Sequence, residues 1–209
     1  MIGEYNLDGT TVNASLVSGV FNATGLAVSG GDLFVANQNG LNVGTIGEYT
    51  TSGGTVNASL VSGLSSAVGL AVSGGDLFVA NQGSNTICEY TTNGVTINTS
   101  LVSGLNAPLG VVVSGGHLFV ANFFGNSIGE YTTNGVTVNA SLVSGLDNPQ
   151  GLAVSGGDLF VSNVADWYSE SAYPEADITS CYPHFSDPPT PCCCCSLFAA
   201  SYRYTCARA

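Results

Sequence analysis

A repeat of about forty residues constrains the fold of this chain more than any other feature of its sequence. The phrase Val-Ser-Gly-Gly-Asp-Leu-Phe-Val-Ala-Asn recurs with at most one substitution at 28–37, 72–81, 113–122 and 154–163. The substitutions are His117 for Asp and Ser162 for Ala. A second phrase, Ile-x-Glu-Tyr, begins at Ile2, Ile46, Ile87 and Ile128. Both phrases recur at offsets of 44, 41 and 41 residues, so they belong to one repeating unit.

Turn residues divide each unit into four short segments. In the copy at 69–109 the segments are rich in Val, Ile, Leu, Thr, Phe and Tyr, and the turns between them include Gly74-Gly75 and Asn93-Gly94. Such dipeptides suit tight hairpins because glycine and asparagine tolerate a positive φ. The pattern predicts four antiparallel strands per unit. The extra residues of the first period fall within 37–45, which predicts a longer loop there.

A four-stranded sheet of this size cannot bury both of its faces alone, so successive units must stack around a common axis. The predicted fold class is therefore all-β, a β-propeller of four-stranded antiparallel blades. The chain divides into three full blades flanked by two complementary half-blades, in the order 1–24, 25–68, 69–109, 110–150 and 151–163. The N-terminal half supplies the third and fourth strands of a blade, and the C-terminal half supplies the first and second.

The sequence of the repeat resembles the NHL-type repeats of six-bladed propellers, over residues 1–163. In that repeat a Gly-Leu-Ala-Val strand leads into a Leu-Phe-Val-Ala-Asn strand and then an Ile-x-x-Tyr strand. It looks closest to low-charge, highly self-similar secreted bacterial proteins, although Asn, Gln and Gly replace the charged residues usual after the second strand. The resemblance implies an extracellular or cell-surface location, while no signal peptide precedes the first strand.

Two alternatives remain for the half-blades. They either pair with each other as a clasp that closes a four-bladed ring, or the chain is a fragment of a larger propeller. The resemblance favours a fragment, because six or more blades are usual for this repeat type. If the ring stays open, its end blades expose apolar faces, and we expect self-association through them.

Residues 164–209 contain none of the sequence motifs of the repeat. All 28 glycines precede this segment, and six of the seven cysteines lie within it. The run Cys192–Cys195 does not match the ligand spacing of a zinc site, so we predict no metal site. We expect a disordered tail, from an unevolved or frame-shifted terminus. A disulfide-rich tail is the alternative, for which six cysteines allow 15 pairings.

The charge balance limits the partners. The formal net charge is −12, and the chain has no lysine. Because affinity for nucleic acid comes largely from Lys and Arg displacing counterions, we expect no nucleic-acid binding. No apolar run approaches the roughly 18 residues that a membrane-spanning helix needs, so we expect no membrane span.

Catalytic candidates are few. Lactonase-like and streptogramin-lyase-like propellers resemble this chain and need convergent histidines and carboxylates, but the repeat region has one histidine, His117, at a position held elsewhere by Asp. We expect a turn residue there, no catalytic residue, no cofactor and no enzyme activity. One glutamate recurs per unit, at Glu4, Glu48, Glu89 and Glu130. These glutamates are either exposed strand residues, which we prefer, or a ring of carboxylates that binds a cation.

The segments after the second strands are better functional candidates, because they vary while the frame repeats. They begin with Gln38, Gln82 and the pair Phe123-Phe124. The phenylalanines either project as an anchor or fold over the blade edge. We predict a non-catalytic binding or scaffold module that contacts a protein or glycan through these residues. The alternative is a fragment of a lactonase-like or lyase-like enzyme whose catalytic blades lie outside this chain.

Overall fold

The computed structural model describes residues 1–39 and 43–164, and the described chain is all-β, with sixteen strands and one short 3₁₀ turn. The predicted tail, apart from Val164, lies outside the described residues, so the expectations for it are not tested. Within the described ranges no helix is long and apolar enough to cross a membrane.

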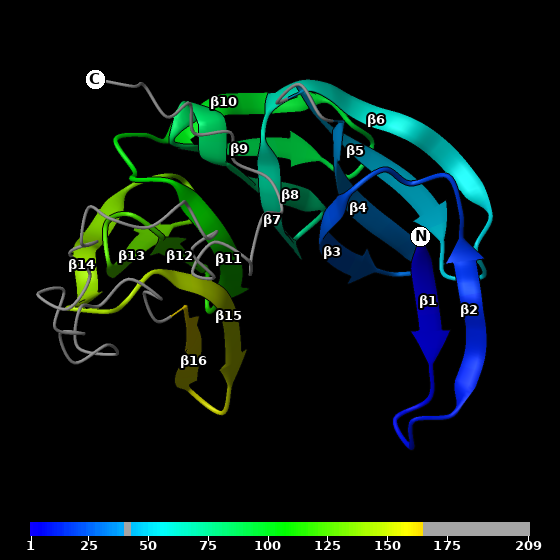
Figure 1. Cartoon of the computed structure of the whole chain (residues 1–209). Coiled ribbons are helices and arrows are strands. Elements are labelled where there is room, and N and C mark those ends of the chain that lie inside the picture. Colours follow the sequence, from blue (N-terminus) through cyan, green and yellow to red (C-terminus); the bar gives the residue numbers. More distant parts are fainter. Residues whose placement is uncertain (40–42, 165–209) are drawn as a thin grey trace, which may run out of the picture. The chain divides into compact units, whose positions relative to one another are not determined.

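Three four-stranded antiparallel sheets form the full blades, and Figure 1 shows each with its strands in chain order. The first contains β3 (Ala23–Ser29), β4 (Asp32–Asn39), β5 (Val43–Thr50) and β6 (Thr55–Ser65). The second contains β7 (Ala67–Ser73), β8 (Asp76–Asn81), β9 (Thr86–Thr91) and β10 (Thr96–Val102), with the 3₁₀ turn η1 (Gln82–Ser84) after β8. The third contains β11 (Pro108–Ser114), β12 (His117–Asn122), β13 (Ser127–Thr132) and β14 (Thr137–Ser144). The predicted all-β architecture with four-stranded blades is confirmed.

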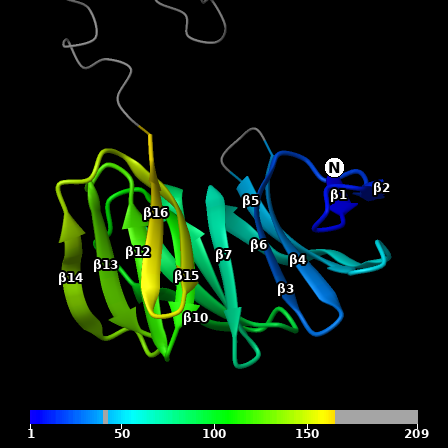
Figure 2. The ribbon, with the colours of Figure 1, turned by 90° about the horizontal axis from the view of Figure 1, so that it is seen from below.

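The two half-blades are separate two-stranded sheets (Figures 1 and 2). One pairs β1 (Ile2–Tyr5) with β2 (Thr11–Val17), and the other pairs β15 (Pro149–Ser155) with β16 (Asp158–Asn163). No ladder joins the two sheets, so the clasp is not formed in this structure.

Apolar contacts between successive sheets form the core. The second strand alternates, so that Leu77 and Val79 pack against the first blade, while Phe78 and Ala80 pack against the third. One such cluster lies at each of the first three interfaces along the chain, and the first of these joins Ile2 and the N-terminal half-blade to the first full blade. Burial on both faces explains why the strands can be apolar almost throughout.

The first strands of neighbouring blades approach one another closely through glycine. A Cβ atom added to Gly25 or Gly69 would collide with the backbone carbonyl of Val68 or Leu109 in the next blade. The Gly-Leu-Ala-Val phrase therefore marks the strand nearest the axis, where there is no room for a side chain between backbones.

The segment 37–45, predicted to hold a longer loop, belongs in large part to two paired strands. β4 reaches Asn39 and β5 begins at Val43, and Gln38 pairs with Gly44 across the two strands. The hairpin is therefore longer than in the other full blades, and its tip, residues 40–42, lies outside the described residues.

Replacing Gly69 by Ala tests the close approach of the first strands. We expect a loss of about 1–3 kcal/mol in the free energy of unfolding, because the added methyl meets a backbone carbonyl. Gly31→Ala is the matched control, since open space surrounds Gly31, and we expect a change within about 0.5 kcal/mol. Urea unfolding followed by circular dichroism measures both, and equal effects would contradict the packing described.

Candidate functional site

We use the term loop rim for the end of the blades formed by Gln38, the segments 82–85 and 123–126, and the connections 18–22, 103–107 and 145–148. The second strand of each full blade ends here, and the three connections run from the last strand of one sheet to the first strand of the next. Backbone hydrogen bonds join the two kinds of segment, because Leu105 donates to the carbonyl of Asn85 (3.2 Å) and Leu146 donates to that of Asn126 (3.1 Å).

Two asparagines fix the rim. Asn85 and Asn126 adopt the left-handed conformation (φ 57° and 50°), which asparagine tolerates better than most residues. The Oδ1 atom of Asn85 accepts the backbone N–H of Ala107 (2.8 Å), and that of Asn126 accepts the N–H of Asn148 (3.0 Å). Each rim loop is thus fastened to the connection that enters the next blade. The sequence analysis did not single out these residues, although their recurrence one residue before the third strand was a usable signal.

Phe123 and Phe124 form an edge-to-face pair, with ring centroids 5.0 Å apart and an interplanar angle of 70°. Phe123 is half-buried, and its backbone N–H donates to the carbonyl of Ala107 (3.1 Å). Phe124 has 65% of its surface exposed. One ring of the pair is therefore half-buried, and it contacts a second ring that is exposed to solvent.

The two predicted glutamines lie on separate blades. Gln82 begins η1, is half-buried, and donates its backbone N–H to the carbonyl of Ser66 (3.0 Å). Gln38 lies within β4 rather than in a loop, and its Oε1 atom accepts a long hydrogen bond from Asn22 Nδ2 (3.4 Å). The structure brings only the phenylalanines of the predicted set into contact with each other.

A cavity of about 410 Å³ lies between the first strands of four successive sheets. Matching triplets line it: Thr24-Gly25-Leu26, Val68-Gly69-Leu70, Leu109-Gly110-Val111 and Gln150-Gly151-Leu152. Its lining is glycine and aliphatic side chains, with Thr24 and Gln150 as the polar ones, and none of its residues is titratable. This cavity suits a small apolar group and offers no acid or base for catalysis.

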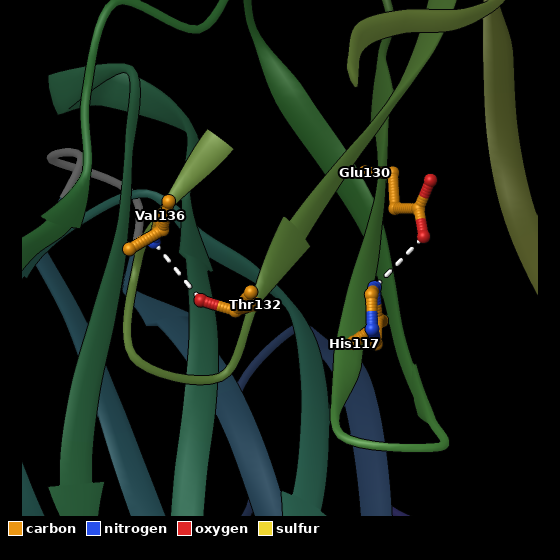
Figure 3. A network of polar contacts seen from close by, with 4 residues as sticks. All are labelled: His117, Glu130, Thr132 and Val136. Atoms are coloured by element: carbon orange, nitrogen blue, oxygen red, sulfur yellow. Dashed lines mark hydrogen bonds and ion pairs between the residues drawn. The ribbon is translucent and has the colours of Figure 1, made fainter. Parts of the chain in front are cut away.

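An ion pair lies at the opposite end of the third blade (Figure 3). His117 Nδ1 is 2.8 Å from Glu130 Oε1, and the two side chains are 37% and 18% exposed. In the turn that follows β13, Val136 donates its backbone N–H to Thr132 Oγ1 (3.1 Å). The sequence analysis predicted only a turn role for His117, which in fact begins β12. Alternate residues of a strand lie on the same face, so the register of the β12–β13 hairpin could have indicated that His117 and Glu130 are diagonal neighbours.

The corresponding positions of the other full blades hold two acids each. Burial raises the pKa of Glu48, and the negative charge of Asp32 raises it further. The pKa of Glu89 is raised for the same two reasons, with Asp76 as the neighbour. Among the described residues no three acids, histidines or cysteines lie close enough to hold a metal ion, so the carboxylate ring is not formed. The first strands line the axis, whereas the glutamates lie on the third, and those of the full blades are half-buried.

The comparisons with known proteins support the fold. No protein-family model and no curated protein matches the sequence. Among solved structures, a gluconolactonase from Xanthomonas campestris is similar over 77% of this chain and 61% of its own, with a TM-score of 0.62 and 15% identity. A catalytically inactive virginiamycin B lyase from Staphylococcus aureus with quinupristin is similar over 77% and 55%, with a TM-score of 0.55 and 20% identity.

The similarity to the computationally designed Ika4 protein covers 72% of this chain and 98% of Ika4, with a TM-score of 0.53 and 16% identity. The chain spans about half the length of several of the natural structures that it matches. At these identities the likenesses show a β-propeller fold and no more. The NHL type of the repeat stays a prediction.

The glutamate of the second blade lies near an acid, whereas that of the third blade contacts His117, so replacing each glutamate should change the stability in different directions. Because folding raises the pKa of Glu89, its charged form costs stability above the folded pKa, and this cost disappears as the pH falls toward the ordinary value. We expect Glu89→Gln to stabilise the protein at pH 7 by less than about 1 kcal/mol, with a smaller gain near pH 4. The matched variant Glu130→Gln loses the carboxylate that contacts His117, and we expect it to be neutral or destabilising. Thermal melts from pH 4 to 7 would contradict this if both variants shifted alike.

Proposed function

We propose that this chain is a non-catalytic binding or scaffold module whose loop rim contacts a protein or glycan. The observation that carries the proposal is Phe124, which is 65% exposed on a loop fastened by hydrogen bonds at Phe123 and Asn126. A rigidly held aromatic ring loses little conformational entropy on binding, so it is a favourable anchor.

The distribution of chemical groups supports a binding role. In the described part of the chain, the one histidine is paired with Glu130 and lies at the blade end opposite the loop rim. The axial cavity has no titratable group in its lining. The lining of that cavity is therefore suited to binding rather than to proton transfer. The proposal includes an extracellular or cell-surface location, which rests on the low-charge composition and the resemblance of the repeat.

A second candidate is a fragment of an enzymatic propeller. The solved structures similar to this chain include a gluconolactonase and virginiamycin B lyases, and the chain spans only part of their length. Under this alternative the catalytic residues lie in blades that this chain does not contain, and the described blades provide the frame.

Phe124→Ser tests the binding role. We expect at least tenfold weaker binding, roughly the loss of one interface anchor, to any partner that the wild type binds on arrays of glycans and of extracellular proteins. Val138→Ser is the matched control, because Val138 is 49% exposed on β14, outside the loop rim. Equal binding by the two variants would remove the rim from the proposal.

A hydrolysis assay tests whether the described blades are themselves catalytic. We expect no turnover of a panel of sugar lactones above the buffer rate. Turnover by the wild type that His117→Ala abolishes would overturn the non-catalytic proposal, because His117 is the one histidine among the described residues. Circular dichroism of the variant checks that the fold persists.

A further inference from the structure

The two ends of the described sheet series expose positions that are buried in every complete interface. At the C-terminal end Phe160 is 57% exposed, whereas the equivalent Phe34 and Phe78 are 1% and 2% exposed. At the N-terminal end Tyr5 is 58% exposed, whereas the equivalent Tyr49 is 5% exposed. The residue is the same at each set of equivalent positions, so the difference in exposure reflects the absence of a neighbouring strand or blade among the described residues.

The open strand edges at the two ends are complementary. In every full blade the second strand pairs with the third, as β12 pairs with β13 in a register that places Phe119 opposite Glu130. β16 is a second strand without a third, and β1 is a third strand without a second. Transferring the register of the third blade places Phe160 opposite Glu4 and Ser162 opposite Ile2.

The outer turns show the same complementarity. The glycine of each third-to-fourth strand turn lies against a leucine of the preceding sheet, in the pairs Gly53 with Leu16, Gly94 with Leu60 and Gly135 with Leu101. The remaining members of the series are Gly9, which has nothing within 4 Å of its Cβ position, and Leu142, which is 40% exposed. At the N-terminal end of the series a turn glycine therefore lacks its leucine neighbour, and at the C-terminal end a leucine lacks its glycine neighbour.

We propose that a second copy of this chain fills these sites, with β1–β2 of one copy completing the blade begun by β15–β16 of the other. The new junction would repeat the interface that already joins the strands and sheets within the chain. A second copy supplies both missing halves, whereas the two half-blades of one chain do not pair with each other.

The strand count sets the stoichiometry. The sixteen described strands equal four blades, so two copies joined at both ends form an eight-bladed ring. Natural propellers typically have four to eight blades, and three copies would make twelve. The contact is head to tail, and it closes when the second junction forms.

The first test is the mass in solution. We expect light scattering under reducing conditions, which prevent cysteines from linking copies, to give twice the chain mass of 21.1 kDa. We also expect the amides of β1 and β16 to be protected from hydrogen exchange. A particle of the chain mass would overturn the proposal, whether these amides are protected by an internal clasp or exchange freely.

Two variants test the head-to-tail contact. Phe160→Glu disables the C-terminal end, and Tyr5→Glu disables the N-terminal end. Both side chains are exposed within one copy, so the fold of each chain should persist. Every junction needs one end of each kind, so we expect each variant alone to dissociate at least about tenfold more readily than the wild type. Val136→Glu is the matched control, since Val136 is 62% exposed in the β13–β14 turn, and it should leave the mass unchanged.

Mixing the two variants provides the decisive experiment. Phe160→Glu retains a working N-terminal end and Tyr5→Glu retains a working C-terminal end, so the mixture should recover particles of two chains through one intact junction. A symmetric contact between like ends predicts no recovery, and such a result would overturn the head-to-tail contact. The wild type could also form particles of more than two copies that both variants reduce to single chains. That result would support the contact between β16 and β1 and would overturn the closed ring of two copies.

Discussion

The need to cover both faces of every sheet governs this structure. Leu77 and Val79 pack toward the preceding blade, while Phe78 and Ala80 pack toward the following one, so neither face of the second blade tolerates water. Burying a side chain such as Phe78 stabilises the fold by about 1.5–3 kcal/mol, and each interface between complete blades contains several such side chains. A single blade therefore has no stable form alone, and its neighbours determine its stability.

This constraint also decides where chemistry can occur. The interfaces use aliphatic and aromatic residues, and the closest approach of the first strands leaves room only for glycine. Charged and variable side chains are restricted to the two ends of the blades. At one end, Asp76 and Glu89 repel each other while His117 and Glu130 attract, and the frame accommodates both arrangements. Partial exposure keeps such interactions weak, which explains this tolerance.

The sequence was sufficient to predict the blades, because hairpin glycines and a recurring strand phrase report local geometry. It was not sufficient for features that depend on contacts between segments. The extended β4–β5 hairpin requires knowing that the inserted residues pair with each other. The His117–Glu130 pair requires the register of two strands, and the hydrogen bond from Ala107 to Asn85 joins residues far apart in the chain. The axial cavity requires four first strands to be placed together.

The same repetition that stabilises the blades makes the two ends of the described chain complementary in sequence and in strand register. A strand that pairs within a blade has nearly the same sequence as the strand left open at an end. The residues that stabilise the internal interfaces therefore also favour pairing at the open ends. The loop rim differs because Phe123 and Phe124 have no counterpart in the other blades. A ligand that reads the rim can therefore distinguish the third blade, whereas a partner that binds the ends recognises the repeat itself. In the two proposals, recognition and assembly thus use separate surfaces of one frame.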